Sequence, residues 1–424
     1  MTDQARTVQR TYLALTLLTT LAASFIWGIN TLFLLDAGLS NTEAFAANAF
    51  FAVGQVIFEI PTGVVADTRG RRFSFMLGAG TLLLSTLLYL WMWDLQAPFW
   101  GWAVASALLG LGFTFFSGAT EAWLVDALNA SGYKGDLEPV FGRAQVVGGA
   151  AMLAGSVAGG FIAQATNLGV PYIVRAAMLG VTLVVAWWFM HDLGFTPQRG
   201  LTPVKAVRGV LAGAVDGGLR NRPVRWLMLA APFTMGVGFY AFYALQPYLL
   251  ELYGDPNAYG IAGLAAALVA STQIVGGLLV ARVRRLFARR THALIIGVVA
   301  SVVLLAVIGL TPTFWIAVAA LMLWGIIGAI EEPMRRAFIN PLIPSQQRAT
   351  VLSFDALMGS AGGVVIQPAL GRSADLFGYG ISYVVAAGIQ ALAIPFTVLS
   401  RLEDAKSDRT DVSLEEEEAA ASAA

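Results

Sequence analysis

The sequence has no cysteine and only two histidines, His191 and His292, among its 424 residues. Disulfides and thiol chemistry are therefore excluded, and a metal site or a nucleophile–histidine pair is hard to build. The sequence also lacks a glycine-rich phosphate loop ending in Lys-Ser or Lys-Thr, which argues against ATP-driven work. We expect a protein that is not an enzyme, with no cofactor, no metal and no nucleic acid partner.

Charged residues are also scarce, at 12% of the chain, whereas 57% of the residues are hydrophobic and the mean hydropathy is +0.71. A chain with this composition cannot cover itself with polar side chains in water. Its apolar stretches, the first over residues 10–35, can each cross a hydrocarbon core about 30 Å thick, which takes roughly 20 helical residues. Because lipid leaves no backbone group unpaired without cost, they predict an all-α membrane protein with twelve transmembrane helices.

Basic residues gather on one side of this arrangement. With the N-terminus in the cytoplasm, 24 of the 26 Lys and Arg residues fall in cytoplasmic segments, as the positive-inside rule requires. The two exceptions are Arg175 and Arg372, near the outer ends of the sixth and eleventh spans. We therefore predict an integral protein of the plasma membrane, the inner membrane of a bacterium, with both termini in the cytoplasm.

A short charged loop joins the second and third apolar stretches. Its glycines are Gly63 and Gly70, and its charges are Asp67, Arg69, Arg71 and Arg72. A turn this short makes the flanking helices antiparallel neighbours, and its arginines place it in the cytoplasm. The loop resembles that of the major facilitator superfamily, which reads Gly, three residues, Asp, a basic residue, any residue, Gly and two basic residues. Thr68 departs from this pattern, because it stands at a basic position.

The chain divides into two halves of similar organisation. We predict an N-terminal six-helix bundle over 1–193, a basic cytoplasmic linker with an amphipathic helix over 194–225, a C-terminal six-helix bundle over 226–400 and an acidic disordered tail over 401–424. An offset of 210 residues aligns the two bundles, as tandem halves would. The aligned pairs are Gly28 with Gly238, Asn30 with Tyr240, Phe33 with Tyr243, Gly118 with Gly328 and Glu121 with Glu331.

The resemblance to the major facilitator superfamily extends over roughly residues 10–400, and the chain is most similar to the twelve-span drug/proton antiporter branch. It implies two pseudo-symmetric halves, a solute cavity near mid-membrane, transport by alternating access and function as a monomer. Span five keeps the glycine spacing of that branch at Gly155, Gly159 and Gly160, which small-residue helix packing explains equally well. Span four carries Ser106 where proton-linked members have an arginine.

The charged loop is interpreted as a gating latch that consists of Gly63, Asp67, Gly70, Arg71 and Arg72, with Asp126 as a further partner of Arg71. The resemblance implies that Asp67 faces the start of span eleven. A carboxylate at a helix N-terminus gains about 0.3–1 kcal/mol, and it gains this only in the state that brings the two together. The alternative is that these arginines only set the topology.

Carboxylates inside the apolar spans are the next candidates, because a charge at mid-bilayer costs about 2.5–3.5 kcal/mol even on a lenient scale. Glu59, Glu121 and Glu331 are the candidate groups for proton coupling or for binding the solute, and Glu121 is the first choice because it lies on a glycine-rich face and has a counterpart in Glu331. Glu332 and Asp355 are expected to pair with Arg335, Arg336 or Arg348 instead. Arg175 either lies at the outer interface or balances a carboxylate in the cavity.

Spans one and seven line the cavity in the resembled family, and here they carry mostly aromatic side chains. The candidate lining residues are Trp27, Asn30, Phe33, Tyr240, Tyr243 and Gln246. Such a wall suits an amphipathic or hydrophobic solute, and a cationic one if Glu59 or Glu121 is within reach of it. The alternative is that these aromatic residues pack outward against lipid.

Three functions follow from these observations. The leading hypothesis is a secondary active transporter that couples a proton gradient to the efflux of amphipathic or hydrophobic small molecules, as a multidrug antiporter does. The second is a proton-coupled or facilitative importer of a small metabolite. The third is a receptor, scaffold or lipid-handling protein on the same fold, which the cost of buried carboxylates argues against.

Overall fold

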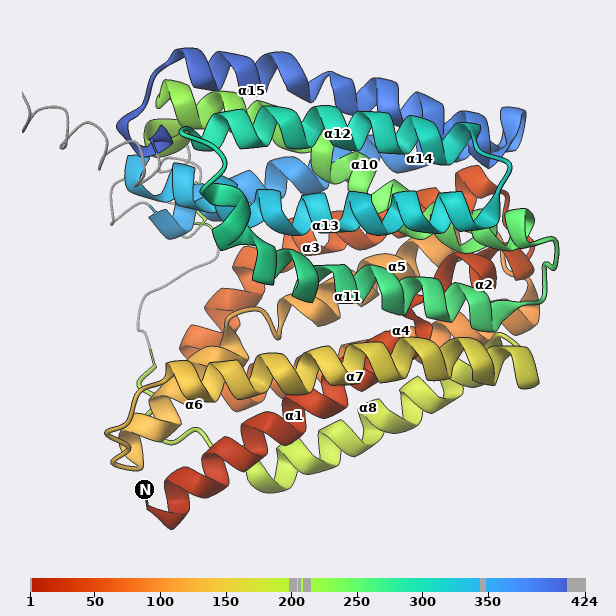
Figure 1. The fold of residues 1–424 in the computed structure, drawn as a ribbon. Helices are drawn as coiled ribbons and strands as arrows, with labels where there is room; N and C mark the ends of the chain where they lie inside the picture. The colour runs from red at the N-terminus through yellow and green to blue at the C-terminus, as the bar shows by residue number, and fades with distance from the viewer. Residues whose placement is uncertain (1, 198–203, 205–206, 209–214, 344–347, 410–424) are drawn as a thin grey trace, which may run out of the picture. The chain divides into compact units, whose positions relative to one another are not determined.

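The computed structural model describes residues 2–197, 204, 207–208, 215–343 and 348–409 (Figure 1). The chain forms two compact units. Unit 1 consists of Met1–Val207 and Leu245–Ala267, and unit 2 consists of Arg208–Ala244 and Leu268–Ala424. Most of the predicted linker helix and the tail from residue 410 onward lie outside the described residues, so those two predictions stay open.

Unit 1 is built from the helices of the first half of the chain, together with the end of α10 and the beginning of α11. Its helices are α1 (Asp3–Trp27), α2 (Asn30–Asp36), α3 (Asn41–Arg69), α4 (Arg71–Leu95), α5 (Phe99–Thr114), α6 (Ala119–Ala130), α7 (Glu138–Ala165) and α8 (Gly169–Phe189). In this unit α1 packs against α7 and α8, and α3 packs against α5 (Figure 1).

Unit 2 contains the remaining parts of α10 and α11 and the helices that follow. They are α10 (Arg222–Tyr253), α11 (Tyr259–Arg284), α12 (Arg290–Leu310), α13 (Phe314–Ile339), α14 (Arg348–Ala391) and α15 (Ala393–Leu402). Here α12 packs against α13, α14 and α15 (Figure 1).

The described helices agree with the predicted all-α membrane fold. Ten of them are long and apolar enough to cross a membrane, and the bent pair of α1 and α2 makes an eleventh. One of the ten extends over 53 residues, Thr350–Leu402, which is far longer than one crossing needs. Gly378 interrupts it with a non-helical φ of +81°. Two consecutive spans therefore lie in this stretch, as the twelve-span prediction requires.

The first span differs from the single continuous helix expected over residues 10–35. It breaks between Trp27 and Asn30, and the two parts differ in direction by 49°. Gly28 lies at the break in tight packing, since a Cβ atom there would come within 2.9 Å of the Cα atom of Gly263. The close approach of α11 explains why this position has no side chain.

The glycines of span five are explained by helix packing. A Cβ atom on Gly155 would lie 2.0 Å from the hydroxyl of Ser24, and one on Gly159 would lie 1.9 Å from the carbonyl oxygen of Phe25. These positions therefore allow the backbones of α1 and α7 to approach closely. The glycine series has a structural cause here, so its spacing adds no independent argument for drug export.

Equivalent hydrogen bonds in the two units support the internal repeat. The Tyr172 hydroxyl donates to Asn30 Oδ1 at 2.9 Å in unit 1, and the Tyr240 hydroxyl donates to Ser382 at 2.5 Å in unit 2. The residues of each pair are 142 positions apart, and both members shift by the same 210 residues. The offset read from the sequence therefore relates equivalent contacts in space.

Candidate functional site

The charged loop between α3 and α4 forms an ion-pair cluster in unit 1. Arg71 Nη1 donates to Asp67 Oδ1 at 2.5 Å, one helical turn away across the loop. Arg71 Nε lies 3.9 Å from Asp126 Oδ2 on α6, as the sequence predicted. Gly70 has a φ of +114°, a conformation that suits glycine. A methyl group at Gly63 would contact no described atom within 4 Å, so this glycine has no packing cause in the structure.

Asp192 completes this loop, although the sequence reasoning missed it. Its Oδ1 accepts a hydrogen bond from the backbone N–H of Arg72 at 2.8 Å, at the N-terminus of α4. A Cβ atom on Gly70 would lie 2.3 Å from Asp192 Oδ2, so the glycine makes room for the carboxylate. Asp192 is 120 residues from Arg72 in the sequence, and no local sequence pattern predicts a helix cap from so distant a residue. The predicted approach of Asp67 to span eleven concerns both units and stays a prediction.

Unit 1 contains a cavity of about 590 Å³. Two charged side chains, Glu121 and Arg175, belong to its wall, together with aromatic and hydroxyl-bearing side chains. The aromatic members are Tyr12, Trp27, Phe75, Phe113 and Phe116, and the hydroxyl-bearing ones are Thr16, Thr19, Thr20, Ser117 and Thr120. The volume falls within the range of small-molecule sites, roughly 300–1,000 Å³.

Glu121 lies in the first turn of α6, where its carboxylate is exposed on the cavity wall. The helix begins after Gly118, whose φ of +67° interrupts span four. The unpaired N–H groups of a first turn and the helix dipole favour a negative charge. Among the described residues no hydrogen bond or ion pair engages this carboxylate. Glu121 is therefore an accessible carboxyl group on the cavity wall.

Glu59 on α3 contacts the wall of the same cavity. The hydroxyl of Ser117, a residue of the cavity wall, donates to Glu59 Oε1 at 2.6 Å. The side chain is half-buried. Glu59 is thus linked to the cavity through Ser117.

Arg175 on α8 is the buried cation of unit 1, with only 2% of its surface exposed. Its Nε donates to the Thr86 hydroxyl at 3.0 Å, and its Nη1 donates to the carbonyl oxygen of Ala22 at 3.1 Å. The structure places Arg175 on the wall of the unit 1 cavity, but among the described residues it pairs with no carboxylate, so the predicted charge balance is not seen. Ser106, which occupies the arginine position of span four, bonds to the Tyr89 hydroxyl at 2.5 Å.

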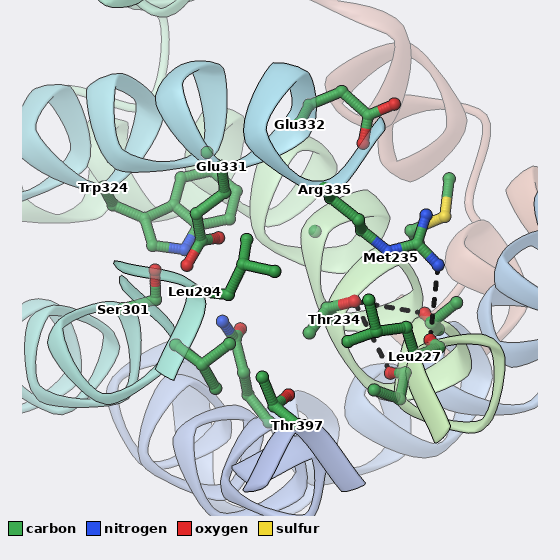
Figure 2. Close-up of a pocket in the computed structure, with 16 residues that line it drawn as sticks. Leu227, Thr234, Met235, Leu294, Ser301, Trp324, Glu331, Glu332, Arg335 and Thr397 are labelled. Atoms are coloured by element: carbon green, nitrogen blue, oxygen red, sulfur yellow. Dashed lines mark hydrogen bonds between the residues drawn. The ribbon is translucent and has the colours of Figure 1, made fainter. Parts of the chain in front are cut away.

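Unit 2 contains a smaller pocket of about 230 Å³ (Figure 2). Glu331, Glu332 and Arg335, all from α13, contribute its charged side chains. Figure 2 shows the carboxyl group of Glu331 turned into the pocket and that of Glu332 turned away from it. Glu332 pairs with Arg336 at 2.5 Å, and Arg335 binds Asp355 through two hydrogen bonds of 2.5 Å each. These pairings agree with the prediction for Glu332 and Asp355.

Glu331 is left without such a partner. Its Oε1 is buried and has no hydrogen-bond partner among the described residues. It lies against Gly297 of α12, where an added Cβ atom would come within 1.9 Å of Oε1. The pocket thus holds a carboxyl group in a niche beside Gly297, and Arg335 of the same pocket pairs with Asp355 instead of with Glu331. Among the residues that the structure describes, no group of three acidic or histidine side chains is placed to bind a metal ion.

The family model of the Major Facilitator Superfamily matches residues 12–288 and 258–423, which is nearly the whole chain. The chain belongs to the Major Facilitator Superfamily. This membership confirms the predicted family and fold class, and it points to transport and not to enzymatic catalysis. An uncharacterized MFS-type transporter of Methanocaldococcus jannaschii is 21% identical over 232 residues, which are 54% of this chain and 57% of that relative's length.

Solved structures of other transporters share the superfamily fold with this chain. The nucleoside transporter NupG has a TM-score of 0.77 at 12% identity, over 92% of this chain and 99% of its own. A bacterial homolog of the human lysosomal transporter Spinster has a TM-score of 0.68 at 15% identity, over 97% and 100%. A POT family transporter in complex with 5-aminolevulinic acid has a TM-score of 0.68 at 12% identity, over 93% and 95%. Identities this low show a common fold only.

The side chains expected to line the cavity of this superfamily member have different positions in the structure. Trp27 lies on the wall of the unit 1 cavity. Four others, Asn30, Phe33, Tyr240 and Gln246, are buried. Asn30 donates to Asn48 at 2.8 Å and accepts from Tyr172, and Phe33 stacks on Tyr172 with ring centroids 4.0 Å apart. These four residues pack the interior in this structure, whereas Tyr243 is half-buried and its ring meets that of the adjacent Phe242.

Gln246 has a further structural role within unit 1. Its Oε1 accepts from the backbone N–H of Thr31 at 2.9 Å, and its Nε2 donates to the carbonyl oxygen of Trp27 at 2.8 Å. One amide therefore satisfies backbone groups on both sides of the break between α1 and α2. The sequence predicted Gln246 as a lining residue of the cavity, but it did not predict these hydrogen bonds to the backbone of the first span.

Proposed function

We propose that this superfamily member is a secondary active transporter that couples protons to the efflux of amphipathic or hydrophobic small molecules by alternating access. It would act as a monomer in the inner membrane of a bacterium, with both termini in the cytoplasm and a proton gradient as its energy source. The observation that carries the proposal is the buried oxygen of Glu331 in the unit 2 pocket, which has no hydrogen-bond partner among the described residues. Uncompensated buried charge is costly, so such a group is suited to take up and release a proton.

Glu331 is a better proton carrier than Glu121, although the internal repeat aligns the two. Glu121 lies in the first turn of α6, where the helix end stabilises its charged form. Glu331 lies in the interior of α13, where the backbone N–H groups are used within the helix. In the proposed mechanism Glu331 exchanges the proton, Glu121 faces the solute, and Glu59 supports the unit 1 cavity through Ser117.

The ion-pair cluster of the charged loop is proposed to act as the latch of this cycle. Asp67, Arg71 and Asp126 are joined through Arg71, and Gly70 and Arg72 hold the start of α4 against Asp192. The free energy of such a cluster changes when one member moves to a new partner. A latch would therefore differ in strength between the conformations of the transport cycle, whereas arginines that only set the topology would not.

Import of a small metabolite is the second candidate, and the composition of the unit 1 cavity favours it. Hydroxyl-bearing side chains form a larger part of its wall than the aromatic pattern of spans one and seven indicated. Such groups can replace the hydration of a polar solute. Two proteins that share the fold are a nucleoside transporter and a POT family transporter in complex with 5-aminolevulinic acid.

Proton flux in proteoliposomes tests the proposal. Purified full-length protein is reconstituted in a known orientation, and the internal pH is followed while lipophilic cations, neutral amphiphiles or polar metabolites are added. Proton movement opposite to an amphipathic solute supports efflux, and movement together with a polar metabolite supports import. Absence of proton movement with transfer of labelled phospholipid between leaflets would favour a lipid-handling protein instead.

A further inference from the structure

Arg175 has hydrogen-bonding capacity that the protein does not use. Its Nη2 is buried and has no hydrogen-bond partner among the described residues, whereas Nε and Nη1 both donate. A guanidinium group carries five N–H donors in a fixed plane and stays charged. A buried donor without an acceptor is unfavourable. Arg175 also belongs to the wall of the unit 1 cavity, so a molecule bound there is a candidate source of the missing acceptor.

The remaining side chain of Arg175 is held in place on both sides. Thr86 accepts from Nε and donates in turn to the carbonyl oxygen of Leu82 at 2.7 Å. Nη1 is fixed on Ala22 of α1. The guanidinium therefore has little freedom to find another partner within the protein, and preorganised donors of this kind bind ligands with little loss of entropy.

Among the residues that the structure describes, no acidic side chain forms an ion pair with this cation. Glu121 is the only acidic side chain among the residues that line the cavity in the described part of the chain, and it forms no ion pair with Arg175. The nearby Tyr89 hydroxyl already bonds to Ser106. A buried cation without a counter-ion is unfavourable, so an anionic group of a bound solute would stabilise it.

We propose that the unit 1 cavity binds a solute that has a carboxylate attached to an apolar body, with Nη2 of Arg175 donating to the carboxylate. This inference rests on the proposed transport function and names the chemical class of its solute. Trp27, Phe113 and Phe116 supply apolar wall for the body of the solute. Three wall hydroxyls already donate within the protein, Thr19 to Leu15, Thr120 to Phe116 and Ser117 to Glu59, whereas Arg175 supplies a cationic donor.

The test compares solutes that differ only in the charged group. Binding of phenylacetate, 4-phenylbutyrate and 8-phenyloctanoate to purified full-length protein is measured by calorimetry, beside their carboxamides and the corresponding amines. We expect at least one acid to bind about tenfold to hundredfold more tightly than its amide, the loss that removal of a charged hydrogen bond produces. Equal affinities for acid and amide, tighter binding of the amine, or no binding of any acid would overturn the proposal.

Variants then assign the preference to Arg175. Arg175→Gln should remove the acid preference while the amide affinity changes less than threefold, and Arg175→Lys should keep part of it, because a lysine is still a cation. Thr86→Val keeps the guanidinium but removes one of its supports, and it should weaken acid binding only partly. An acid preference that persists in Arg175→Gln would overturn the assignment.

The binding measurement is independent of transport. A protein that binds the acids but moves no protons would contradict the proposed function and leave the carboxylate site in place. A protein that couples protons to lipophilic cations and shows no preference for acids would do the reverse. The two failures are therefore distinguishable.

Discussion

Arg335 binds Asp355 through both of its terminal nitrogens, each donating to a different carboxylate oxygen at 2.5 Å. The same arginine lies one helical turn after Glu331 and would otherwise be its natural partner. Because Asp355 occupies the guanidinium, Glu331 keeps a buried oxygen with no partner among the described residues. The proton-carrying role proposed for Glu331 depends on this arrangement.

Asp355→Asn should destabilise the protein and also change Glu331. Removing one partner of a buried ion pair costs about 3–5 kcal/mol, because the other charge stays buried and uncompensated. Arg335 would then be free to pair with Glu331 and hold it in the charged form. The melting temperature in detergent should fall, and the double variant Asp355→Asn with Arg335→Gln should recover part of the loss. An unchanged melting temperature in Asp355→Asn would contradict this account of the pair.

Gly297→Ala should push the carboxyl group of Glu331 out of its niche. The new methyl group would lie 1.9 Å from Oε1 in the present arrangement, and forcing extra volume into packed sites costs about 1–3 kcal/mol. We expect a lower melting temperature and weaker proton coupling, with stability regained in Gly297→Ala combined with Glu331→Ala. Gly277→Ala on α11 is the control, since a methyl group there meets no described atom within 4 Å.

Asp67→Asn should impair transport at least about tenfold without reducing insertion into the membrane, because the arginines that set the topology remain. The variant loses the ion pair with Arg71, whose length is 2.5 Å. Asp126→Asn removes the longer contact of 3.9 Å and should have a smaller effect. Transport rate and membrane yield are measured together, and a wild-type rate in Asp67→Asn would show that the loop is no latch.

Gln246→Leu should destabilise unit 1 at the break in the first span. The backbone N–H of Thr31 and the carbonyl oxygen of Trp27 would both lose their partner, at about 1–3 kcal/mol for each buried group. The melting temperature should fall clearly below that of Gln273→Leu, a matched change at an exposed glutamine of α11. Equal melting temperatures for the two variants would show that the amide does not hold the break.

The fold was predictable because it depends on features that recur along the whole chain. Span length, apolar composition and the one-sided placement of Lys and Arg are summed over many residues, so single exceptions do not disturb them. The loop motif was equally readable, since Gly70 and its charges are close in sequence, and the predicted contact of Arg71 with Asp126 is present.

The details of the cavities were less predictable because they depend on partners far apart in the sequence. Asn30 and Gln246 looked like polar anchors for a solute, yet their amides satisfy groups 18 to 219 positions away. Glu331 lacks a partner because Arg335 pairs with Asp355, and its carboxyl group has room because Gly297 has no side chain. Neither relationship leaves a local pattern in the sequence.

The most direct measurement of the central claim is solute-driven proton flux in proteoliposomes that contain wild type, Glu331→Gln or Glu332→Gln. Glu332 is the matched control, because it is the neighbouring carboxylate but is exposed and paired with Arg336. We predict that Glu331→Gln lowers coupled proton flux at least about tenfold and removes the pH dependence of transport, whereas Glu332→Gln stays within about twofold of wild type. Wild-type flux and pH dependence in Glu331→Gln would contradict the account, and their loss in Glu121→Gln instead would assign the proton to unit 1.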